Sequence, residues 1–241
     1  MTKFLIISSI FLSIGTLGFF GLNYYENTNN CTFEYVAIDT QILCISNYKR
    51  DLEDFGIKKP LILLYPTSDT LINVTLKYAP GFSATYPEYS SEKQGWSVQA
   101  HSDGTLKNFS SNQDTYGLFW EGNPGSTIYD LSKSFVIKGS ELRNFLYNKL
   151  TEIGLNTKEK SDFIMYWYPK LQQYSYIQIT FAGKDYTDTA KLNITPTPDS
   201  LLRVFMVAKL LSEYKEIPEQ KLSKFERKGF SVVEWGGTIV Q

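Results

Sequence analysis

This sequence lacks an excess of either positive or negative charge. Its 241 residues hold 24 Lys and Arg against 25 Asp and Glu, which gives a formal net charge of −1. Binding to nucleic acid depends on Lys and Arg that neutralise phosphates. No basic stripe interleaved with aromatic residues occurs in this sequence. We therefore expect no nucleic acid partner.

Residues that carry common catalytic and metal chemistry are also scarce. His101 is the only histidine, so a Ser-His-Asp or Cys-His site would have to use it. The H-E-x-x-H, C-x-x-C, G-x-S-x-G and phosphate-loop signatures are absent. Asp185 and Asp188 could bind a hard cation such as Ca²⁺, but a solvated turn explains them more simply. We expect no metal site and no cofactor.

The N-terminus holds the one long apolar run. No charged residue occurs from Phe4 to Leu22, whereas Lys3 precedes this run and Glu26 follows it. At about 1.5 Å per residue, a helix of this length nearly spans a hydrocarbon core of roughly 30 Å. The pattern predicts a signal-anchor transmembrane helix in residues 1–25, with a cytoplasmic N-terminus and an extracytoplasmic body. Secretion after signal cleavage is the alternative, although no small-residue cleavage site follows the run.

Two cysteines, Cys31 and Cys44, follow the apolar run in a stalk that we place at residues 26–58. If the body is exported, it lies in an oxidising compartment, where an even pair of cysteines is typical of a disulfide. We therefore predict a Cys31–Cys44 bridge that closes a hairpin. The alternative is a pair of buried free thiols.

Strands dominate the pattern of residues 59–241. The clearest is "LINVTLKY", in which apolar and polar residues alternate with the period of a half-buried strand. Similar strands are expected at "GWSVQA", "YGLFWE", "SFVIKG", "IMYWYP", "YIQITFAG", "AKLNIT" and "FSVVEW", and, less clearly, at "DSLLRVFMVAKLL". We predict a mainly β (α+β) fold, an antiparallel β-sandwich-like domain with a short helical insertion.

The helical insertion is expected in two segments. In "SELRNFLYNKLTEIG" the apolar residues recur on one face, with Ser140 as N-cap and Gly154 as the stop. A shorter helix is expected in "NTKEKSDF", capped by Thr157. Pro169 argues against its continuation through "MYWYPKL".

Twice, a Glu stands beside a Trp at the end of an expected strand and close to a Gly: Trp120–Glu121 and Glu234–Trp235. Glycoside cleavage uses two carboxylates, and an apolar neighbour can keep one of them protonated. Glu121 and Glu234 are therefore the catalytic candidates of a carbohydrate-active hydrolase. Trp120 and Trp235 are the candidates for a ligand-binding face, since indoles stack on sugar rings.

Packing explains the same pairs without catalysis. Successive residues of a strand point to opposite faces, so each Glu should lie away from its own Trp, and the Gly should make a turn. We favour this interpretation. It predicts buried indoles, with carboxylates that point to solvent or pair with Lys or Arg.

From about Lys59 to Gly237 the chain resembles an uncharacterised family of exported proteins. The resemblance is carried by "KPLILLYP" (59–66), "YGLFWEG" (116–122), "YTDTAKL" (186–192) and "FERKGFSVVEWGG" (225–237). It implies that these segments belong to one exported domain, and it assigns no activity and no catalytic residue. Together the observations predict a membrane-anchored extracytoplasmic domain with a binding or surface-structural role, whose ligand would be a carbohydrate or a protein.

Overall fold

The computed structural model describes residues 6–8, 21–23 and 56–241, and the chain divides into two units, Met1–Asp54 and Phe55–Gln241. In the first unit, β1 (Ile6–Ser8) pairs antiparallel with β2 (Gly21–Asn23). The rest of the predicted anchor and residues 26–55 of the predicted stalk, with Cys31 and Cys44, lie outside the described residues, so the anchor helix and the disulfide stay predictions. Among the described residues, no helix is long and apolar enough to cross a membrane.

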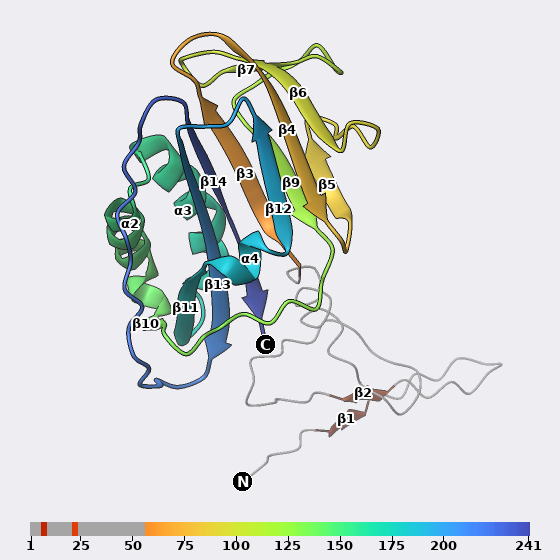
Figure 1. The fold of residues 1–241 in the computed structure, drawn as a ribbon. Helices are drawn as coiled ribbons and strands as arrows, with labels where there is room; N and C mark the ends of the chain where they lie inside the picture. Colours follow the sequence, from red (N-terminus) through yellow and green to blue (C-terminus); the bar gives the residue numbers. More distant parts are fainter. Residues whose placement is uncertain (1–5, 9–20, 24–55) are drawn as a thin grey trace, which may run out of the picture. The chain divides into compact units, whose positions relative to one another are not determined.

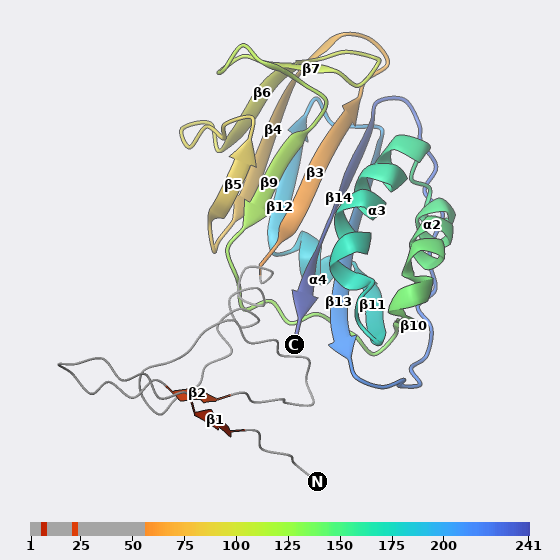
Figure 2. The ribbon, with the colours of Figure 1, turned by 180° about the vertical axis from the view of Figure 1, so that it is seen from behind.

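The second unit contains two β-sheets (Figures 1 and 2). The seven-stranded sheet has the order β10 (Phe135–Lys138), β11 (Tyr176–Ala182), β13 (Ser200–Leu211), β14 (Ser231–Val240), β3 (Lys58–Tyr65), β9 (Leu118–Gly122) and β5 (Phe82–Tyr86). The five-stranded sheet has the order β12 (Ala190–Thr195), β4 (Thr70–Tyr78), β6 (Gly95–Ala100), β7 (Leu106–Asn108) and β8 (Asp114–Thr115). The helical elements are η1 (Gly139–Glu141), α2 (Leu142–Ile153), α3 (Thr157–Leu171) and α4 (Lys184–Thr187).

The second unit has three layers. The five-stranded sheet packs on one face of the seven-stranded sheet, and α2 and α3 cover part of the other face (Figure 2). Strand β3 is buried on both of its faces, and its sequence is a continuous apolar run. Ile62 and Leu64 enter the core between the sheets, whereas Leu61 and Leu63 enter the core beneath the helices. A strand buried on both faces needs apolar residues at every position.

The prediction of a mainly β, sandwich-like α+β domain is confirmed, but its purely antiparallel character is wrong. Strands β13 and β14 pair in parallel. Parallel neighbours need a long crossover, which residues 212–230 supply as an extended segment that runs past α2 (Figure 1). The Phe225 N–H donates to the Ile153 carbonyl, and Arg227 pairs with the buried Glu159. Because this crossover contains neither helix nor strand, no periodic pattern in the sequence announces it.

Helix α2 matches the predicted segment, although its start differs. Gly154 has the left-handed φ of 109°, and its N–H donates to the carbonyls of Leu150 and Thr151, as expected for a C-terminal stop. Ser140 is not the N-cap, because the 3₁₀ turn η1 precedes α2 and Glu141 occupies the cap position without a side-chain hydrogen bond.

Helix α3 is longer than predicted and runs through Pro169, so "IMYWYP" is not a strand. Asn156, and not Thr157, is the N-cap: its side chain accepts from the Glu159 N–H, while Glu159 accepts from the Asn156 N–H. Phe163 and Trp167 lie on one buried face of the helix. Their burial outweighs one backbone hydrogen bond lost at Pro169 in the last turn.

Two glycines after Trp235 continue β14, so the turn expected there is wrong. Gly236 lies opposite a bulge in β3, where a Cβ atom would stand 2.9 Å from atoms of Pro60. At Gly237 a Cβ atom would stand 2.5 Å from the Met206 carbonyl oxygen and 2.7 Å from the Trp167 ring. Both positions need glycine because other parts of the chain approach the strand closely.

Candidate functional site

The two Trp-Glu pairs are joined to each other in the core between the sheets. The Trp120 indole N–H donates to Glu234 Oε1 at 3.1 Å, so the Trp of the first pair binds the Glu of the second. The other oxygen, Glu234 Oε2, accepts from Nε of Arg203 at 2.5 Å. Only 1% of the Glu234 side chain is exposed. This carboxylate is therefore a partner inside the core and has no access to a substrate.

Arg203 connects this core ion pair to the second sheet. Its Nη1 donates to the Ala190 carbonyl at 2.7 Å, and its guanidinium lies 4.6 Å from the centre of the Tyr186 ring. Tyr186 in turn stacks on Phe205 at 3.9 Å. Complete burial, with the negative charge of Glu234 nearby, raises the pKa of the Tyr186 hydroxyl well above its usual value. Arg203 thus ties β13 to β14 and to β12.

Trp235 lies on the opposite face of β14, beneath α3. Its ring centre is 5.5 Å from that of Phe163, and the side chain is fully buried. Trp120 is also fully buried. The packing interpretation predicted buried indoles, and this is what the structure shows. Neither indole offers a surface on which a sugar ring could stack.

Glu121 lies on the other face of the seven-stranded sheet from Glu234. It accepts from the Lys59 N–H at 3.3 Å and from the Tyr166 hydroxyl at 3.4 Å, and it pairs with Lys58 at 3.7 Å. The sheet therefore separates the two glutamates. A glycosidase needs its two carboxyl groups on either side of one bond, and this geometry does not bring Glu121 and Glu234 together.

Helices α2 and α3 leave strands β9 and β5 of this sheet uncovered (Figure 2). We define the open face as the outward side chains Lys59, Tyr86, Phe119, Glu121 and Tyr166. Tyr86 and Phe119 are directly opposite each other across the β5–β9 ladder, and Glu121 follows Phe119 on the same side of β9. Half of the Tyr86 surface is exposed, while Phe119 and Tyr166 are half-buried. Aromatic and polar side chains therefore share one surface, on which Tyr86 is exposed and the others are partly buried.

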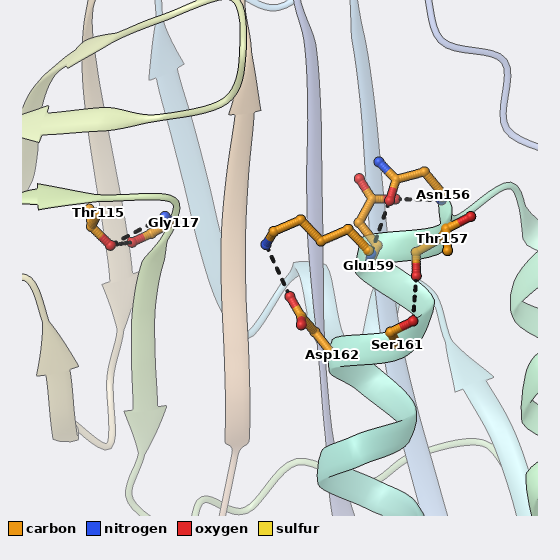
Figure 3. Close-up of polar contacts among 8 residues, drawn as sticks. Thr115, Gly117, Asn156, Thr157, Glu159, Ser161 and Asp162 are labelled. Atoms are coloured by element: carbon orange, nitrogen blue, oxygen red, sulfur yellow. Dashed lines mark hydrogen bonds and ion pairs between the residues drawn. The ribbon is translucent and has the colours of Figure 1, made fainter.

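The first turns of α3, with Asp162, lie opposite the corner at Thr115 and Gly117 that connects β8 to β9 (Figure 3). Lys158 and Asp162 are one turn apart and pair at 3.2 Å, and Tyr166 follows one turn later. The Lys158 ammonium lies 3.3 Å from the centre of the Tyr116 ring. Burial, assisted by the Asp162 carboxylate, raises the pKa of Tyr116. At this end of the surface, the Tyr116 ring thus has a lysine ammonium over it.

Lys59 has an unusual backbone for a strand residue. Its φ is +57°, in the left-handed region that few non-glycine residues adopt. It belongs to the bulge opposite Gly236, and the Lys59 N–H is directed at Glu121. The Lys59 ammonium lies 4.9 Å from the centre of the Phe119 ring. Bulges that redirect a side chain are over-represented beside functional sites.

Two further polar regions of the second unit are the cavity at the end of β11 and the pair formed by His101 and Asp69. A cavity of about 480 Å³ at the end of β11 is lined by Asp130, Lys133 and Asp185, among others. Asp185 already accepts the Asp130 N–H at 3.0 Å, and the described residues contain no group of three side chains able to hold a metal ion. His101 pairs with Asp69 at 2.8 Å on the surface.

Comparison with known proteins finds no matching family model, no matching curated protein and no matching solved structure. The resemblance to a family of exported proteins therefore stays a prediction.

Most of the open face was missed by sequence reasoning. The alternation in β9 could have placed Phe119 beside Glu121, since Leu118 and Trp120 form the buried set. No sequence signal links Tyr86 or Tyr166 to them, because strand pairing and helix packing bring these residues together.

Proposed function

We propose that this chain is a non-catalytic binding protein, anchored in a membrane by its N-terminal segment, whose extracytoplasmic domain binds a saccharide at the open face. The observation that carries the proposal is the adjacency of Tyr86 and Phe119 across β5 and β9, with Glu121 beside them. Exposed aromatic rings stack on the apolar faces of sugar rings. The Tyr166 hydroxyl donates to Glu121, and the oxygen atoms of both groups are acceptors for sugar hydroxyls.

A binding role fits this surface better than the alternative, a carbohydrate-active hydrolase. Glu121 is engaged by Lys58, the Lys59 N–H and Tyr166, and Asp162 is paired with Lys158. A hydrolase would need a second carboxylate on the same surface, placed across the scissile bond. The only partner that the sequence suggested for Glu121 is Glu234, which lies inside the core.

Replacing Tyr86 with Ala tests the ligand face. We expect binding of the full-length protein in detergent to an array of immobilised saccharides to weaken about tenfold, which corresponds to about 1.4 kcal/mol and to a typical aromatic contact. The matched control is Tyr147→Ala, since Tyr147 is exposed on α2 away from the open face. Equal loss in both variants, or no saccharide bound by the parent, would contradict the proposal.

The location of the domain is tested in intact cells that express the full chain. We expect added protease to degrade residues 56–241 without lysis, and mass spectrometry of the membrane fraction to recover peptides from Phe4–Leu22. The reason is the uncharged run between Lys3 and Glu26. A soluble protein that begins beyond Leu22 would support secretion instead. Protection of the domain until lysis would contradict export.

A further inference from the structure

We infer that the saccharide bound at the open face is acidic, and that Lys59 is the residue that selects its carboxylate or phosphate group. This inference rests on the proposed function, because it concerns the ligand of the same surface. It is carried by the balance of charge on the face and by the backbone that holds Lys59 in place.

The carboxylates of this surface are already neutralised. Glu121 pairs with Lys58, and Asp162 pairs with Lys158. Lys59 is different, because its ammonium makes no ion pair with any residue of the described part of the chain. An unneutralised positive charge thus remains where the aromatic rings are, and an anionic ligand complements it.

The position of Lys59 is also set by the fold. The ammonium lies over the Phe119 ring, and the backbone is held in the left-handed region by the bulge opposite Gly236. A lysine gains nothing from that conformation, which Gly or Asn adopts at lower cost. The neighbouring Pro60 lies in close contact with Gly236, so the bulge cannot relax without displacing β14. Residues whose strained backbone is held in place by the surrounding structure cluster at functional sites.

A neutral ligand would leave the Lys59 ammonium with the Phe119 ring as its contact and without an anionic partner. A sugar that carries a carboxylate or a phosphate can stack on the exposed Tyr86 ring and place its charge at the Lys59 ammonium, which lies over the neighbouring Phe119 ring. Glu121 does not repel it, because Lys58 neutralises the Glu121 carboxylate.

The test compares the parent with Lys59→Asn and Lys191→Asn on one array of neutral, uronic-acid and phosphorylated saccharides, using the full chain in detergent. Asn keeps the left-handed backbone and removes the charge. Lys191 is an exposed lysine on β12 in the other sheet. We expect the parent to prefer acidic members at low salt and to lose that preference as salt rises. Lys59→Asn should bind them at least fivefold more weakly and unfold at the same temperature or a higher one, whereas Lys191→Asn should bind like the parent.

Each outcome decides one claim. Equal binding of neutral and acidic members, lost in Tyr86→Ala, would overturn the acidic ligand and leave the saccharide face intact. Absence of binding to every member would overturn both. A Lys59→Asn variant that binds acidic members like the parent would remove Lys59 from the site. Preference for uronic-acid over phosphorylated members, or the reverse, would identify which anion the site takes.

Discussion

The Arg203→Met variant should lose about 3–5 kcal/mol of unfolding free energy, because it leaves a carboxylate buried without its cation. Glu234 is 1% exposed, and its one remaining hydrogen bond would come from the Trp120 indole. The Ala190 carbonyl would also lose its donor from Arg203. The measurement is urea unfolding of the full chain followed by tryptophan fluorescence, which reports on this core because Trp120 lies in it.

The double variant Arg203→Met/Glu234→Gln separates charge from packing. Glu234→Gln alone should also be costly, since the Arg203 side chain is only 8% exposed and would stay charged. The double variant should recover part of the summed loss, because neither charge remains. Lys149→Met breaks an exposed pair with Glu152 and should cost less than about 1 kcal/mol. Strictly additive losses in the double variant would show that the two charges are not coupled.

Much of β14 could be predicted from its own residues. The alternation in "FSVVEW" places Glu234 and Trp235 on opposite faces, and the structure confirms it. The partners of Glu234 could not be predicted, because Arg203 comes from the neighbouring strand β13 and Trp120 from β9 beyond β3, and only the order of the sheet places them near Glu234. One signal was present: an arginine inside the apolar run "DSLLRVFMVAKLL" must find a buried acceptor.

Aromatic residues misled the assignment of α3. In "IMYWYP" they favour a strand, and Pro169 argued against a helix. The structure shows that Phe163, Trp167 and Leu171, each four residues apart, form one buried stripe. The helical period extends across the proline, and the apolar core under α3 decides the outcome against local preference. The backbone of Lys59 on the open face could not be predicted for a similar reason, since the bulge that contains it lies opposite Gly236 on another strand.

Loss of the Trp235 side chain should produce the other large effect. Trp235→Ala removes a fully buried indole between β14 and α3, and we expect it to cost about 3–5 kcal/mol of unfolding free energy. The cavity should not collapse easily, because Gly237 already brings the Trp167 ring against the same strand and Phe163 packs on the indole.

Comparison of Trp235→Ala with Tyr86→Ala distinguishes packing from binding. Both variants are measured by thermal unfolding and on the saccharide array. Trp235→Ala should have a much lower unfolding temperature than the parent. At temperatures below its own unfolding, it should still bind saccharides. Tyr86→Ala should change stability by less than about 1 kcal/mol, as an exposed residue does, and lose binding. A Trp235→Ala protein with the stability of the parent and no saccharide binding would contradict the packing role and return the indole to the ligand site. The expected result instead assigns the indoles to the two cores, Trp235 beneath α3 and Trp120 between the sheets, on strands that flank β3, the strand of Lys59.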